Sequence, residues 1–190
     1  MRWSIILLFF LFSLGCNPNY YDVKQTLWPE KTDSYYQLSQ RWTRQETIHK
    51  GLDQSIDFTC TLQSLEWSKG FAQKWAKVYG LNQKEANKFC LEQIKTAKTQ
   101  TSFFLAISGP NSKVTSIDVL SPLWRIFLQT PKGKVYPLSV RELEWPFAKV
   151  KTFYPLVNPW QRFYLVEFPP INHFQSLIIT GPEGRVVFQW

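Results

Sequence analysis

From residue 101 to the C-terminus, short runs of β-forming residues are separated by turn residues, and this punctuation limits the folds open to the chain. Proline or glycine interrupts the runs about every 8–15 residues, a spacing that favours an antiparallel β-sandwich over a parallel sheet with crossover helices. The runs predict strands at 102–108, 115–120, 124–129, 134–140, 148–154, 162–168, 175–180 and 185–190.

A strand and a helical hairpin precede this β-rich region. Residues 55–63 alternate between apolar and polar side chains, which indicates a half-buried strand of the same sheet system. Residues 65–98 predict two helices with apolar stripes. Gly80 supplies a left-handed stop for the first, and Asn82 with Glu85 forms a capping box for the second. The short connection makes the pair a hairpin.

A further helix is predicted before residue 51. Apolar residues recur at spacings of three and four from Tyr35 to Trp42. Thr32 or Asp33 can cap the start, and the helix is expected to end before Gly51.

These elements predict one domain over residues 32–190. We expect an α+β fold: an antiparallel β-sandwich of about 7–9 strands with an N-terminal helix and an inserted helical hairpin. The β-rich part comprises residues 55–63 and 101–190. Residues 16–31 lack periodicity and contain two prolines, so they predict a tether.

The first fifteen residues have the pattern of an export signal. Arg2 precedes an almost wholly apolar run of about 12 residues, and a small residue stands before Cys16. A membrane-spanning helix needs about 20 apolar residues, and Asn17-Pro18 prevents an extension of this run. Residues 1–15 therefore predict a signal peptide.

The four residues Ser13-Leu14-Gly15-Cys16 resemble the lipobox of bacterial lipoproteins, in which the cysteine thiol receives a diacylglycerol before cleavage. The resemblance implies an acylated Cys16, with palmitate among its acyl chains, and a protein held on a membrane outside the cytoplasm. The lipobox usually has Leu where this chain has Ser13, so an ordinary secretory signal stays open. Asn17 is not the Asp that retains such proteins at the inner membrane, which implies the outer membrane, facing the periplasm.

Several phrases also resemble a group of uncharacterised predicted lipoproteins of diderm bacteria. The phrases are Trp42-Thr43-Arg44, Gly51-Leu52-Asp53, Tyr79-Gly80-Leu81, Pro146-Phe147, Phe153-Tyr154-Pro155, Tyr164-Leu165-Val166, Phe168-Pro169 and Thr180-Gly181-Pro182 with Gly184. They span most of the mature chain in order. The resemblance implies a lipid-anchored protein and no particular activity.

Two cysteines remain once Cys16 is acylated. An even pair in an oxidising compartment makes a disulfide between Cys60 and Cys90 possible, and two buried free thiols are the alternative; the sequence leaves both open. No histidine or further cysteine stands at metal-ligand spacing, so no metal site is expected.

Catalytic patterns are missing from the sequence. Neither His49 nor His173 accompanies the residues of a hydrolase triad, and there is no glycine-rich phosphate loop. Glu142 and Glu144 could form a paired acid–base site, but their basic neighbours favour surface ion pairs. We therefore expect no enzyme and no cofactor.

The formal net charge of +8 favours anionic neighbours such as phospholipid or lipopolysaccharide headgroups. The densest basic set fits solvated helix faces: Lys69, Lys74, Lys77, Lys84, Lys88, Lys95 and Lys98. Nucleic acid is not an expected partner, because the compartment is wrong and no stacking motif accompanies the lysines.

Aromatic residues make up 17% of the chain, which suggests either a core of large side chains or a binding patch. The patch predicted for a partner comprises Tyr154, Trp160, Arg162 and Tyr164. The favoured function is a non-catalytic binding or scaffold module for another envelope protein. The alternatives are a periplasmic carrier or sensor of a hydrophobic ligand held under the aromatic helix and, less favoured, a hydrolase.

Overall fold

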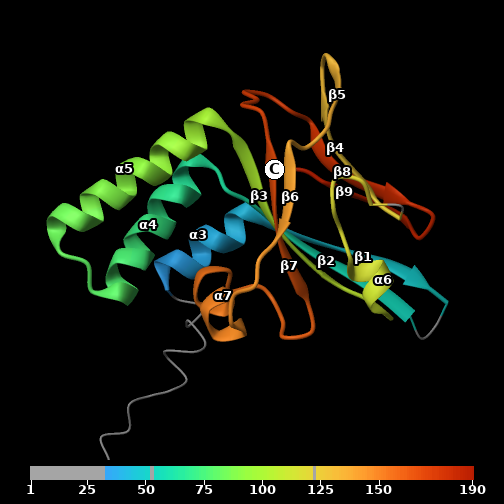
Figure 1. The fold of residues 1–190 in the computed structure, drawn as a ribbon, viewed down its shortest axis with the longest axis horizontal. Coiled ribbons are helices and arrows are strands. Elements are labelled where there is room, and N and C mark those ends of the chain that lie inside the picture. The colour runs from blue at the N-terminus through green and yellow to red at the C-terminus, as the bar shows by residue number, and fades with distance from the viewer. Residues whose placement is uncertain (1–32, 52–53, 122) are drawn as a thin grey trace, which may run out of the picture.

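Nine strands in the described part of the chain form two antiparallel sheets (Figure 1). The computed structural model describes residues 33–51, 54–121 and 123–190, so the signal peptide, Cys16 and the tether lie outside the described residues. The first sheet contains, in spatial order, β1 (Thr43–Lys50), β2 (Gln54–Leu62), β3 (Thr101–Ser108), β7 (Arg162–Phe168) and β6 (Ser139–Glu142). The second contains β5 (Gly133–Val135), β4 (Arg125–Thr130), β8 (Ser176–Gly181) and β9 (Gly184–Phe188).

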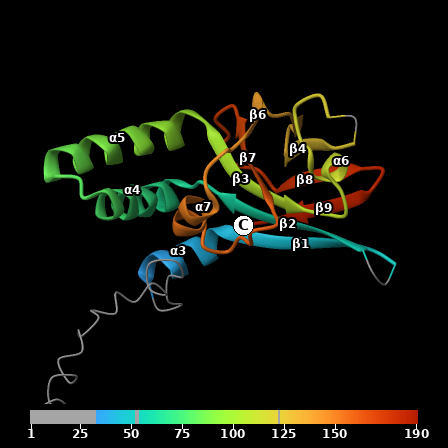
Figure 2. The same cartoon turned by 60° about the horizontal axis from the view of Figure 1, so that its bottom comes forward.

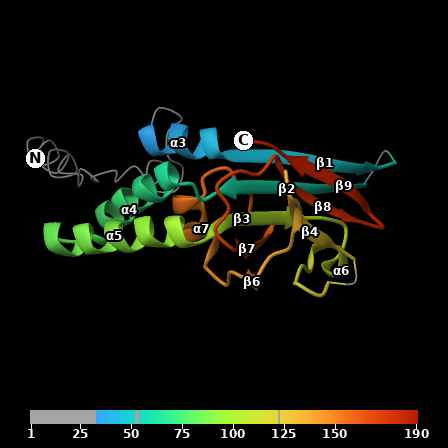
Figure 3. The same ribbon diagram turned by 90° about the horizontal axis from the view of Figure 1, so that it is seen from above.

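Five helices accompany the sheets in the described ranges. They are α3 (Ser34–Trp42), α4 (Leu65–Tyr79), α5 (Gln83–Thr99), α6 (Ser112–Thr115) and α7 (Phe147–Phe153). The helices α3, α4, α5 and α7 gather at one end of the molecule, and the second sheet lies at the other (Figures 1 and 3). Among the described helices, none combines the length and apolarity that a bilayer crossing requires.

Strand β3 supplies side chains to two separate hydrophobic cores. Its residues from Ser102 to Ile107 are all buried. Phe103, Leu105 and Ile107 face the second sheet, whereas Phe104 and Ala106 face the helices, because successive side chains of a strand point to opposite sides. The first sheet is therefore the middle layer of the fold.

The helical core consists mainly of stacked aromatic rings. Trp67 of α4 stacks on Tyr154 at 5.3 Å between ring centroids, and Tyr154 stacks on Phe104 of β3 at 3.6 Å. Phe71 meets Phe153 of α7 edge-on at 5.3 Å. Most aromatic side chains of α4 and α7 therefore serve to pack the helical core.

The helical hairpin is confirmed with both of its caps. Gly80 ends α4 in the left-handed conformation with φ of 61°. The Asn82 side chain accepts from the Glu85 backbone, and the Glu85 carboxylate accepts from the Asn82 backbone, each at 3.0 Å. Only the first half of α4 is buried, so the hairpin projects from the body (Figure 2).

The first helix ends before Gly51, as expected, and it ends well before that residue. The helix α3 ends at Trp42, and residues 43–50 form the edge strand β1 rather than further helical turns. β1 pairs with β2 over its whole length, from Thr43 opposite Thr61 to Lys50 opposite Gln54. This pairing satisfies the backbone groups of a segment with little apolar periodicity of its own.

Two predicted strands were wrong. Residues 115–120 are not a strand: α6 ends at Thr115, after Asn111 has capped its start by accepting from two backbone amides at 3.1 Å. Residues 148–154 lie almost entirely in α7, whose Val150 and Phe153 are three residues apart and both buried in the helical core. A spacing of three places both side chains on one helix face.

The predicted strand 134–140 is divided between the sheets. β5 pairs with β4 in the second sheet, and β6 pairs with β7 in the first. Pro137 lies between them and lacks the amide that a continuous ladder needs. The fold class is nevertheless confirmed: an α+β sandwich of nine strands with an N-terminal helix and an inserted hairpin.

We predict that Gly181→Ala destabilises the protein by about 3 kcal/mol, because a Cβ at this position would overlap the backbone carbonyl of Leu123. The matched control is Gly80→Ala, where no atom lies within 4 Å and only the positive φ opposes a side chain, at a cost of about 1 kcal/mol. Urea unfolding of both variants measures the difference. Equal losses would contradict the close approach at Gly181.

Candidate functional site

The predicted patch of Tyr154, Trp160, Arg162 and Tyr164 is not one surface. Tyr154 and Tyr164 are only 4% and 1% exposed, whereas Trp160 is 85% exposed. The alternation of β7 turns Tyr164 into the core between the sheets, where its hydroxyl donates to the Thr115 carbonyl at 2.7 Å. The prediction was wrong for the two tyrosines, and Trp160 is the exposed anchor that remains.

Trp160 lies in a loop, residues 154–161, whose conformation is held by the buried side-chain amide of Gln161. The Gln161 side chain is buried and donates to Thr59 of β2 at 3.2 Å. The same amide accepts from the Asn158 backbone at 3.0 Å, and the Asn158 side chain accepts from the Trp160 backbone at 3.0 Å. These bonds hold the backbone of Trp160 in one turn while its ring faces solvent.

Two further contacts hold the same loop. The ammonium of Lys151 on α7 donates to the Val157 carbonyl at 2.8 Å, and the Gln45 amide on β1 donates to the Leu156 carbonyl at 3.2 Å. Burial of Lys151 lowers the pKa of its ammonium. Because α7, β1 and β2 all bind the loop, it should lose little entropy when a partner covers it.

Arg162 and Glu142 form a bidentate pair beside this loop. The Arg162 guanidinium donates from Nε at 2.9 Å and from its terminal nitrogen at 2.6 Å. The hydrogen bonds to Glu142 raise the pKa of Arg162. Glu142 therefore forms a surface ion pair, as its basic neighbours favoured, but the partner is Arg162 across β6 and β7 and not one of those neighbours.

The cores also contain buried phenols and one buried thiol. Burial raises the pKa of Tyr154, against a hydrogen bond from Gln63 at 2.8 Å that lowers it. Burial also raises the pKa of the Cys60 thiol. The possible disulfide between the two cysteines does not form: Cys60 is buried in β2, Cys90 is half-buried on α5, and both are free thiols.

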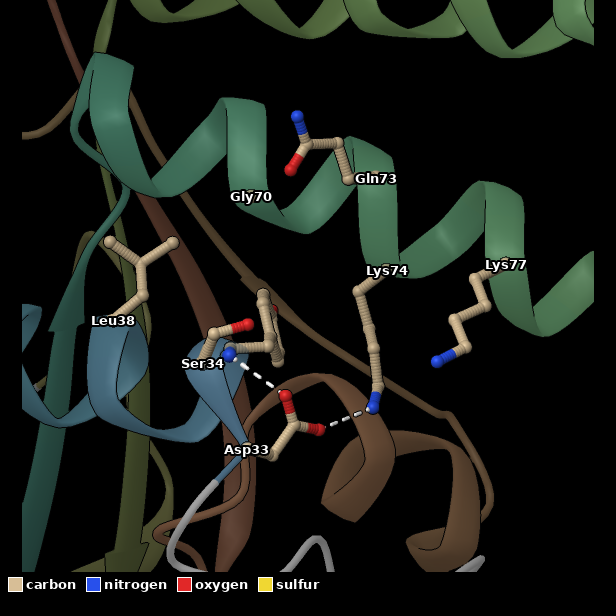
Figure 4. Close-up of a pocket in the computed structure, with 8 residues that line it drawn as sticks. Asp33, Ser34, Leu38, Gly70, Gln73, Lys74 and Lys77 are labelled. Atoms are coloured by element: carbon tan, nitrogen blue, oxygen red, sulfur yellow. Dashed lines mark hydrogen bonds and ion pairs between the residues drawn. The ribbon is translucent and has the colours of Figure 1, made fainter.

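A pocket of about 340 Å³ lies between α3 and α4 (Figure 4). Asp33 caps α3 by accepting from the Tyr35 backbone at 2.9 Å and pairs with Lys74 at 3.0 Å. Partial burial opposes the ionised Asp33, but the bonds from Lys74 and Tyr35 hold the pKa of this carboxyl below its ordinary value. Lys77 also lines the pocket and adds a second cation.

The described residues offer few groups for chemistry on a substrate. His49 on β1 and His173 before β8 are both exposed. In the ranges that the structure describes, no three His, Cys, Asp or Glu residues gather as a metal site.

Sequence reasoning missed the support of the 154–161 loop. The anchoring amide Gln161 bonds a residue 102 positions away in the chain, and no local pattern marks that contact. An Asn two residues before Trp160 was the readable signal, because Asn side chains often bond backbone amides two residues on.

Comparisons with known proteins identify no family for this α+β sandwich. No protein-family model matches the chain, and no curated protein matches it. The chain is similar in structure to a novel protein of unknown function from Burkholderia pseudomallei, with 11% identity and a TM-score of 0.42, over 90% of this chain and 86% of that one.

We predict that Trp160→Ala changes the free energy of unfolding by less than about 0.5 kcal/mol, because its ring is exposed. Trp67→Ala, which removes a ring that is only 2% exposed, should cost about 4 kcal/mol. Thermal and urea unfolding of the two variants provide the test. A large loss with Trp160→Ala would show that its ring supports the fold instead of being free for binding.

Proposed function

We propose that this chain is a lipid-tethered protein of the bacterial cell envelope and that its body is a non-catalytic binding or scaffold module for another envelope protein. The observation that carries the binding role is Trp160, 85% exposed on a loop that five hydrogen bonds involving side chains hold in place. Tryptophan is among the residues that contribute most to protein interfaces, and a rigid loop lowers the entropy lost on association.

The partner role predicts specific cross-linking at the 154–161 loop. A photo-crosslinking amino acid at position 160, expressed in the full chain in cells, should yield one discrete protein adduct. Position 120 is the matched control, because Leu120 is 83% exposed and lies in a different loop. Identical adducts at both positions, or none at position 160, would refute a partner at this loop.

The anchor is proposed from the residues around Cys16. Asp33 lies 17 residues after Cys16 and pairs with Lys74 of α4, so the proposed tether joins the helical end of the molecule. An outer-membrane position facing the periplasm accords with Asn17 after the cysteine.

We predict that Cys16→Ser abolishes incorporation of labelled palmitate and moves the protein from the membrane to the soluble fraction. The expected loss is essentially complete, because a membrane anchor of acyl chains depends on that single thiol. Cys90→Ser is the control: it removes the half-buried free thiol of α5 and should leave labelling unchanged. Labelling that persists in Cys16→Ser would end the anchor proposal.

A further inference from the structure

Four lysines form one stripe along α5. Lys84, Lys88, Lys95 and Lys98 follow one another at spacings of four, seven and three residues, which places them within an arc of about 80° on a helix. Each is exposed, and Leu91 in the middle of the stripe is 67% exposed. The stripe is about 21 Å long at the helical rise per residue.

The stripe lies opposite the face by which α5 is held. Phe89 packs against Trp75 and Phe71 of α4, at 5.5 and 6.2 Å between ring centroids, and it is about half a turn from the centre of the stripe. All residues of α5 are described, and none of them is buried. The helix projects from the body (Figure 2), and its lysine face is on the side away from the contact of Phe89 with α4.

The positive charge is concentrated in the helical end. The helices α4, α5 and α7 carry nine lysines and three glutamates, whereas the nine strands carry seven cations and four acids. Among the ion pairs between described residues, none involves a lysine of the stripe. These four charges are available to an external anionic surface.

We propose that the α5 stripe is a docking surface for the anionic phospholipid headgroups of the membrane that holds Cys16. This inference rests on the proposed lipid anchor. The 17 residues from Cys16 to Asp33 can span at most about 60 Å, which keeps the helical end within reach of the headgroups. Lysine stems can lie along the interface while their ammonium groups contact phosphates, and Leu91 can enter the acyl boundary.

The expected effect follows from the strength of single headgroup contacts. Each lysine near an anionic bilayer contributes about fivefold to membrane affinity, and these contributions weaken as salt screens them. Contributions to affinity multiply, so the loss of all four lysines should weaken vesicle binding well beyond about 30-fold at low salt.

The test uses the mature chain with Cys16→Ser, so that no acyl chain contributes to binding. Sedimentation is measured with vesicles of phosphatidylcholine containing about one-third phosphatidylglycerol. Replacing all four stripe lysines with Gln should weaken binding by at least about 30-fold, and replacing them with Arg should preserve it. Vesicles of phosphatidylcholine alone, or about 1 M salt, should abolish binding.

The matched control removes the same charge from the β body. Lys113, Arg125, Lys132 and Arg185 are exposed, and their joint replacement with Gln should weaken binding by less than about threefold. Circular dichroism verifies that α5 persists in the stripe variant, since Gln and Lys have similar helix propensities.

Three results would overturn the inference: equal losses in the two variants, unchanged binding in the stripe variant, or equal binding to uncharged vesicles. Failure of the Cys16→Ser chain with an intact stripe to bind anionic vesicles refutes only the docking surface. Failure of the unmutated chain to incorporate palmitate refutes the anchor, so the two failures are distinguishable.

Discussion

The double burial of β3 is the constraint on which the remaining structure depends. A strand covered on both faces needs apolar side chains at every position, and Phe103 to Ile107 provide them without interruption. One set of side chains attaches the second sheet, and the other attaches the helices through Phe104. A polar residue in this strand would leave one of the two layers without its central contacts.

The helical layer leaves two surfaces that the core does not use. The aromatic rings of α4 and α7 close the first sheet, and Lys151 of α7 then holds the loop that presents Trp160. The helix α5 has no buried residue and contacts the helical core through the partly buried Phe89, which packs on α4. Both proposed binding surfaces, at Trp160 and along the lysine stripe, thus follow from how the helices are packed.

Local patterns were reliable where the determining contacts are local. The caps at Gly80 and Asn82 depend on residues within a few positions, and both form as expected. The strand at 43–50 and the helix at 148–154 were not predicted, for the opposite reason. β1 takes its conformation from β2, and α7 from the helical core that receives Val150. The prediction of the partner patch failed for the same reason. Tyr154 and Trp160 are both aromatic, but Tyr154 is buried and Trp160 is exposed, and the local sequence does not distinguish them.

The sequence by itself determined the hairpin, the mixture of helix and antiparallel strand, and the lysine spacing along α5. These properties depend on periodicity and capping, which short stretches of chain encode. Only the tertiary structure decided which aromatic residues are buried, that Cys60 and Cys90 stay apart, and that Gln161 fixes the Trp160 loop to Thr59. Burial and long-range hydrogen bonds arise between segments far apart in the chain, so no local pattern specifies them.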